Sequence, residues 1–77
     1  MTIKIYGAVW CSDCIHAKNF LQSKGIMFEY VDITDNEDAI AFVEQANNGK
    51  RIIPTLEING EIYTNPGING LMKIITQ

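Results

Sequence analysis

The sequence predicts a small α/β domain in which three helices flank a mixed four-stranded sheet. Strand-like and helix-like segments alternate along the first half of the chain. An Asn-Gly dipeptide separates two short β-rich segments in the second half, and 77 residues leave room for one domain only. We therefore expect a single domain that spans residues 1–77.

The first half of the chain predicts a strand, a helix and a second strand. Residues 2–6 alternate polar and apolar side chains, as a half-buried strand does, and residues 7–10 interrupt that pattern as a loop. Residues 12–24 have helical spacing, and Gly25 is typical of the left-handed residue that ends a helix. Residues 26–33 are rich in β-forming side chains and predict the second strand. The helix is expected to bury Cys14, Ala17, Phe20 and Leu21.

A second helix is expected to begin directly after this strand. Thr34 and Glu37 fit a capping box, in which Thr34 is the N-cap and the Glu37 side chain bonds back to it. From there the helix runs to about Ala46. The side chains expected to be buried on it are Ala39, Ile40, Phe42, Val43 and Ala46.

The rest of the chain predicts a hairpin and a last helix. Residues 55–58 and 61–64 are two short strands around Asn59-Gly60, the strongest dipeptide signal for a two-residue turn. Residues 68–75 form the last helix. A helical crossover allows the first two strands to be parallel, whereas the hairpin adds an antiparallel pair. By analogy, this order of elements is the minimal thioredoxin fold.

Charge and hydropathy exclude two classes of partner. The net charge is −3 and the six Lys and Arg residues are scattered, whereas binding to nucleic acid needs clustered basic side chains. No apolar run approaches the roughly 18 residues of a membrane span, and residues 1–6 lack the apolar core of a signal peptide. We therefore expect a cytoplasmic protein without nucleic-acid or membrane partners, and a monomer.

Cys11 and Cys14 form a Cys-x-x-Cys pair between the first predicted strand and its helix. The first cysteine of such a pair lies where free amide N–H groups and the helix dipole favour negative charge, and the thiolate is the attacking species. We therefore expect Cys11 to attack a substrate disulfide and Cys14, one turn further inside, to resolve the mixed disulfide. Asp13 places a carboxylate near Cys11, which opposes the thiolate and makes the pair more reducing.

Metal binding is the main alternative for these cysteines. Tetrahedral zinc usually needs four ligands, and the chain has no second cysteine pair. His16 is the only histidine and, two residues after Cys14, points to another side of the helix. No metal site is therefore predicted. An iron–sulfur or metal carrier, with a cluster bridged by two chains, and a purely structural cysteine pair stay open beside the redox interpretation.

Pro54 directly precedes a predicted strand. A proline at the entry of a strand has no N–H to donate to the ladder, and this role alone would explain its position. Its functional interpretation is a cis proline that packs against the Cys11 sulfur and exposes the backbone of Ile53 to an extended substrate. We expect this second role, because a Cys-x-x-Cys pair precedes Pro54 and a hairpin follows it.

With these motifs the chain resembles the glutaredoxin family, above all its mycoredoxin-type and glutaredoxin-like members with Trp-Cys-x-x-Cys. The resemblance covers Trp10 to Cys14, residues 48–55 and residues 64–66. It implies a thioredoxin fold, reduction of disulfides in proteins or small thiols, and no tightly bound cofactor. The substrate contacts that it implies lie at Trp10, Arg51, Ile53, Pro54, Gly67 and Ile68.

Three positions depart from the glutathione-dependent members of that family. Ala8 stands where they commonly have a lysine, Asp13 replaces an aromatic residue, and Asn69 replaces an acid that meets the glutathione amino group. Arg51 does match a carboxylate-binding position. The resemblance thus leaves two electron donors open, a low-molecular-weight thiol such as glutathione and thioredoxin reductase. The alternative in the same enzyme class is a small redoxin that carries electrons from thioredoxin reductase to ribonucleotide reductase, although residues 63–66 lack its Trp-Ser-Gly-Phe-Arg-Pro-like segment.

Overall fold

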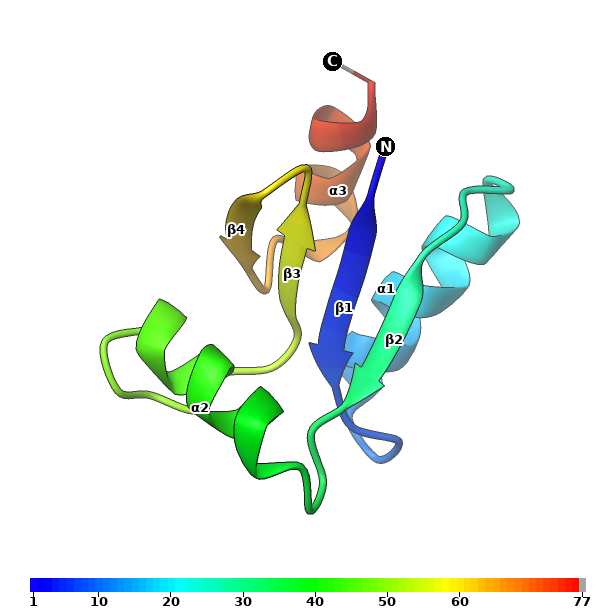
Figure 1. The fold of residues 1–77 in the computed structure, drawn as a ribbon. Coiled ribbons are helices and arrows are strands. Elements are labelled where there is room, and N and C mark those ends of the chain that lie inside the picture. Colours follow the sequence, from blue (N-terminus) through cyan, green and yellow to red (C-terminus); the bar gives the residue numbers. More distant parts are fainter. Residues whose placement is uncertain (77) are drawn as a thin grey trace.

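The computed structural model describes residues 1–76 and confirms the predicted order of strands and helices (Figure 1). The elements are β1 (Ile3–Gly7), α1 (Ser12–Ser23), β2 (Glu29–Asp32), α2 (Glu37–Ala46), β3 (Thr55–Ile58), β4 (Glu61–Thr64) and α3 (Gly67–Ile75).

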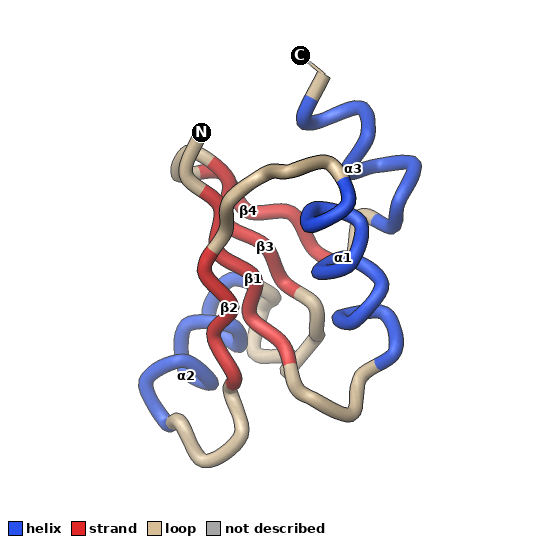
Figure 2. Tube along the Cα trace, turned by 90° about the vertical axis from the view of Figure 1, so that its right-hand side faces the viewer, coloured by secondary structure: helices blue, strands red, loops and turns tan. Residues whose placement is uncertain are grey.

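The four strands form one mixed sheet in the order β2-β1-β3-β4. β1 runs parallel to β2, as the helical crossover through α1 requires, and antiparallel to β3, which pairs with β4 as a hairpin. Asn59 and Gly60 in the hairpin turn both have positive φ angles, 52° and 86°, as a type I′ turn demands. Helices α1 and α3 cover one face of the sheet and α2 covers the other (Figure 2).

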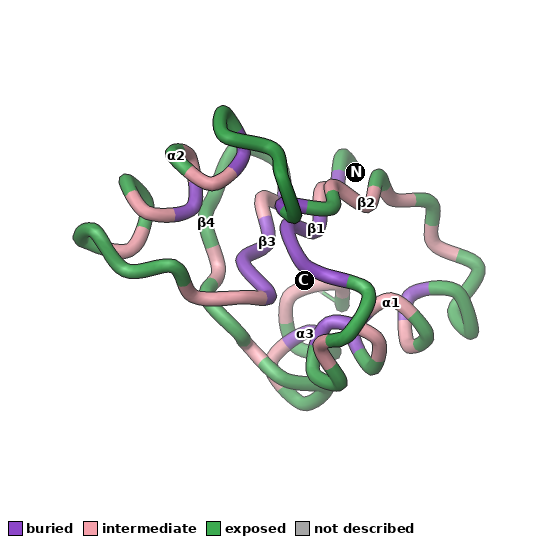
Figure 3. Tube along the Cα trace, turned by 90° about the horizontal axis from the view of Figure 1, so that it is seen from below, coloured by how far each residue is buried: buried purple, intermediate pink, exposed green. Residues whose placement is uncertain are grey.

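Each face of the sheet has its own apolar cluster, because side chains on a strand alternate between the two faces. Figure 3 shows the buried positions along β1 and β3 and on one side of each helix. The cluster under α1 and α3 comprises Ile3, Ile5, Ala17, Leu21, Leu56, Ile58 and Leu71. The cluster under α2 comprises Tyr6, Ile33, Ala39 and Val43.

The predicted capping box at the start of α2 is wrong. The N-cap is Asn36, whose side-chain oxygen accepts a hydrogen bond from the Ala39 N–H at 3.1 Å. Thr34 lies in the preceding turn instead, where its N–H donates to Asp32 Oδ1 at 3.0 Å. This local bond from an aspartate to the backbone two residues on favours a turn over a helix start. Ala46, expected in the core, is exposed at the last turn.

The second strand is shorter than predicted, because Ile26 belongs to the end of α1. Gly25 has the expected left-handed φ of 69°, and its N–H donates to the Gln22 carbonyl. The Ile26 N–H donates to the Leu21 carbonyl, which completes a Schellman motif. Strand pairing therefore starts only at Glu29.

Candidate active site

Cys11 is the N-cap residue of α1, at the end of the loop that follows β1. Its backbone is extended, with φ −89° and ψ 113°, and its sulfur accepts a hydrogen bond from the Cys14 N–H at 3.3 Å. Sulfur thus takes the place that a serine or aspartate oxygen usually has at a helix start. The sulfur is partly exposed to solvent, next to an amide donor and the positive end of the helix dipole. Cys11 therefore presents its sulfur at the open end of the helix.

Cys14 lies one turn further along and is completely buried. Burial raises the pKa of its thiol to about 12, and the neighbouring Cys11 sulfur adds to this rise. The backbone of Ala8 and the hydroxyl of Tyr30 act in the opposite direction. Both cysteines are free thiols in this structure.

Gly7 and Tyr30 pack next to Cys14. The sequence did not identify either of them as a site residue. A Cβ on Gly7 would lie 2.7 Å from both Cys14 Sγ and Tyr30 Oη, so only glycine fits there. Gly7 also extends β1 by one residue beyond the expected end. The Tyr30 hydroxyl donates to the Ala8 carbonyl at 2.8 Å and ties β2 to the cysteine loop. A glycine within a strand pattern does signal such a close approach.

Pro54 is buried at the entry of β3, and the Ile53-Pro54 peptide bond is cis, as predicted. Its carbonyl accepts a hydrogen bond from the Asn65 N–H at 2.8 Å, which anchors the loop before α3. The backbone N–H and C=O of Ile53 form no hydrogen bond with any residue from 1 to 76. An extended substrate would find free backbone groups at this edge.

The six predicted substrate contacts are divided between two hollows. Trp10, Arg51 and Ile53 line an open groove of about 1050 Å³ beside the β2–α2 loop. Pro54, Gly67 and Ile68 line a smaller hollow of about 250 Å³ under the N-terminus of α3. Asp13 and Asn69 line this second hollow too, and Asp13 Oδ2 lies 3.5 Å from Asn65 Nδ2.

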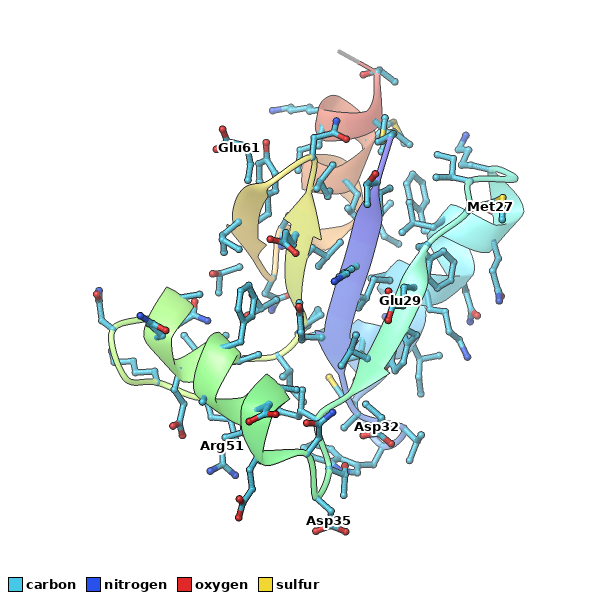
Figure 4. All side chains as sticks on the ribbon, in the orientation of Figure 1. Met27, Glu29, Asp32, Asp35, Arg51 and Glu61 are labelled. Atoms are coloured by element: carbon cyan, nitrogen blue, oxygen red, sulfur yellow. The ribbon has the colours of Figure 1, made fainter. Side chains whose placement is uncertain are left out.

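Arg51, the residue expected to contact a substrate carboxylate, forms an ion pair on the surface. Its Nε lies 3.4 Å from Glu44 Oε2 on α2, and both side chains are more than one-third exposed. Figure 4 shows Arg51 at the same end of the molecule as Asp32 and Asp35, which also line the groove. The remaining acids on this groove are Glu37 and Asp38. The surroundings of Arg51 are therefore acidic, and its binding role stays a prediction.

Two further features bear on the class of site. Within the described residues, no group of three or more His, Cys, Asp or Glu side chains is placed to hold a metal ion. His16 is exposed on α1 and lines the smaller hollow. None of the helices in residues 1–76 has the length and apolar character to cross a membrane.

Comparison with known proteins agrees with this geometry. Residues 3–63 match the glutaredoxin family model. This chain belongs to the glutaredoxin family. A Mycobacterium tuberculosis protein that carries the glutaredoxin name is 37% identical over 65 residues, which cover 83% of this chain and 77% of the relative. Mycoredoxin 1 of Corynebacterium glutamicum is 32% identical over 65 residues, which cover 83% of this chain and 80% of that protein.

The fold agrees as well. The crystal structure of a thioredoxin-like protein superposes with a TM-score of 0.81 over 94% of this chain and 97% of the other, at 24% identity. The protein is therefore a glutaredoxin-like thiol-disulfide oxidoreductase with a thioredoxin fold and a dithiol pair. Members of this family use thiol reductants.

Proposed function

We propose that Cys11 is the nucleophile and Cys14 the resolving cysteine in the reduction of disulfides in proteins or small thiols. The contrast between the two sulfurs carries this assignment: one is partly exposed at a helix N-terminus, and the other is completely buried. The Cys11 thiolate attacks a substrate sulfur, forms a mixed disulfide and releases the first substrate thiol. Cys14 then attacks Cys11 and releases the second, so that two electrons and two protons pass from the dithiol to the substrate.

The substrate would lie over the cis proline, between the two hollows. The free backbone groups of Ile53 would pair with an extended segment of the substrate, and the exposed Trp10 ring would cover its apolar part. On the other side, Pro54, Gly67 and Ile68 would contact the residue that bears the disulfide. Such contacts act on the orientation of the attacked sulfur.

Two single substitutions test the assignment of the cysteines. Cys11→Ser should abolish reduction of a protein disulfide such as that of insulin, because no other accessible thiol remains. Cys14→Ser should instead accumulate a mixed disulfide through Cys11, which mass spectrometry of the intact protein detects as an adduct. A mixed disulfide in Cys11→Ser, or full dithiol turnover in Cys14→Ser, would refute the proposal.

The physiological reductant is either a low-molecular-weight thiol such as glutathione or thioredoxin reductase, and no cofactor is tightly bound. Arg51 would contact the carboxylate of such a thiol. Arg51→Ala should then raise KM for glutathione disulfide and leave kcat for a neutral small disulfide unchanged. Glu44→Gln, which removes the present partner of Arg51, should lower that KM. Turnover with thioredoxin reductase alone, and no effect of either substitution, would point to the reductase.

We further propose that the protein acts as a monomer in the cytoplasm. In that compartment thiols are kept reduced, which suits a dithiol reductase. Size-exclusion chromatography with light scattering tests the oligomeric state, and fractionation of the source cells tests the location.

A further inference from the structure

The hydroxyl of Tyr30 is a polar group near the buried Cys14. Neither the attack of Cys11 on the substrate nor that of Cys14 on Cys11, as proposed above, uses this hydroxyl. Tyr30 lies on β2 opposite Ile5, and its half-buried ring packs against the cluster under α1. The hydroxyl donates to the Ala8 carbonyl at 2.8 Å. The same oxygen and the Cys14 sulfur both lie 2.7 Å from the position that a Cβ on Gly7 would take, so the two atoms are at most twice that distance apart. A small rotation of the phenol or of the Cys14 side chain would offer this donor a second acceptor.

The titratable and charged groups near this pair are few. Cys11 on α1 faces Cys14 from one side, and Tyr30 faces it from β2. Near Tyr30 are Asp32 on the same strand and Lys18 on α1, whose ammonium lies 5.9 Å from the ring centroid. Burial raises the pKa of Tyr30, with Cys14 as a further cause, so the hydroxyl stays protonated at neutral pH. It is therefore a donor throughout the working range.

We propose that Tyr30 is a positioning residue for the resolving step, and this inference rests on the proposed function. In the mixed disulfide its hydroxyl turns from the Ala8 carbonyl to the Cys14 sulfur and donates a hydrogen bond to the attacking thiolate. Cys14 gives up its proton to solvent water, its sulfur bonds to the Cys11 sulfur, and the bond between Cys11 and the substrate sulfur breaks. The substrate sulfur leaves with the electron pair and takes up a proton from solvent. The phenolic proton stays on Tyr30.

The stage at which Tyr30 acts is set by the mixed disulfide, because its formation removes the negative charge that Cys11 could carry. In the dithiol, the neighbouring Cys11 sulfur adds to the effect of burial and raises the pKa of Cys14 further. A Cys11 sulfur bonded to substrate can no longer carry a negative charge. The groups that favour the Cys14 thiolate, the backbone of Ala8 and the hydroxyl of Tyr30, are then opposed by burial alone. The contribution of Tyr30 thus comes at the resolving stage.

Rapid mixing of the reduced protein with 4,4′-dipyridyl disulfide separates the two steps. Attack by Cys11 releases one equivalent of thiopyridone, which is followed by its near-ultraviolet absorbance, and resolution by Cys14 releases a second. Tyr30→Phe keeps the ring and removes only the hydroxyl. We expect an unchanged first phase and a second phase that is about tenfold slower near neutral pH. The difference should shrink as the pH rises, because Cys14 then ionises without a donor.

The matched control is Tyr63→Phe, which removes a hydroxyl from another half-buried tyrosine of the same core, on β4. It should leave both phases unchanged. Equal second-phase rates in Tyr30→Phe and wild type would overturn the inference. Slowing of both phases by one factor would also overturn it, because the hydroxyl would then only tie β2 to the cysteine loop. Release of two equivalents by Cys14→Ser would instead refute the resolving role of Cys14, which is part of the proposed function.

Discussion

Cys11 and Cys14 lie within one turn of α1, but their surroundings have little in common. Cys11 caps the helix, is partly exposed, and receives an amide hydrogen bond on its sulfur. Cys14 is completely buried against Gly7 and beside a phenolic hydroxyl. The two thiols therefore differ in their access to solvent and substrate, although only two residues separate them in the chain. The roles proposed for them follow from the packing around each sulfur.

Alkylation of the reduced protein should show the largest difference. We expect iodoacetamide near pH 7 to modify Cys11 at least about 100-fold faster than Cys14, because a buried thiol with a pKa of about 12 supplies almost no thiolate. Fragment-ion mass spectrometry locates the label, and in urea the two cysteines should react alike. If Cys14 were labelled before Cys11 in the native protein, the predicted difference in access between the two thiols would be contradicted.

The stability of the folded protein at alkaline pH should depend on the raised pKa of the buried Cys14 thiol. The pKa of Cys14 rises from its ordinary 9.0 to about 12 in the folded protein, so above pH 9 the unfolded chain loses a proton that the folded chain keeps. The stability due to this thiol is complete below pH 9 and falls towards pH 12 by up to about 1.4 kcal/mol per pH unit. The free energy of unfolding, measured with urea, should therefore fall more steeply between pH 9 and 11 for the reduced wild type than for Cys14→Ser. Parallel curves would contradict the raised pKa.

Gly7→Ala should disturb one cysteine and spare the other. The new methyl group would lie 2.7 Å from the Cys14 sulfur and the Tyr30 hydroxyl, so these groups must move. We expect a loss of about 1–3 kcal/mol in the free energy of unfolding, measured by urea titration. The rate at which iodoacetamide modifies Cys11 should stay within a factor of about two of wild type. Unchanged stability would show that Cys14 is less tightly packed than described.

Asp13→Asn should have the smallest effect, on the redox potential. Asp13 is an exposed carboxylate in the first turn of α1, where its charge opposes a thiolate at Cys11 and so disfavours the dithiol form. Its removal should make the potential less negative by no more than about 20 mV, because exposed charges interact by about 1 kcal/mol or less. Equilibration with a glutathione redox buffer measures the shift. Asp38→Asn, in the first turn of α2, is the matched control and should leave the potential unchanged.

The elements could be predicted because their signals are local. The pattern of residues 2–6, the glycine at position 25 and the Asn59-Gly60 turn each specify a backbone conformation within a few residues. The start of α2 is harder to predict, because Thr34 and Asn36 are both good N-cap residues. The hydrogen bond that the Thr34 N–H donates to Asp32 decides between them. The capping-box pattern of Thr34 and Glu37 does not reveal that the Thr34 N–H bonds to Asp32.

The candidate site was predictable only in part, for a similar reason. Cys11, Cys14 and the cis proline belong to short motifs that the sequence displays directly. Tyr30 reaches the cysteines through the pairing of β2 with β1, which brings its hydroxyl to the Ala8 carbonyl across 22 positions of the chain. The pairing of Arg51 with Glu44 likewise depends on how α2 lies against the following loop.

Trp10 has a practical consequence for studies of this enzyme. It is the single tryptophan of the chain, it directly precedes Cys11, and 74% of its surface is open to solvent. All indole emission of the protein therefore comes from this edge of the molecule and none from the core. Each change of partner at the neighbouring sulfur alters the immediate environment of this one indole. The protein thus carries a built-in optical probe of its own turnover, and kinetics can be followed without any attached dye.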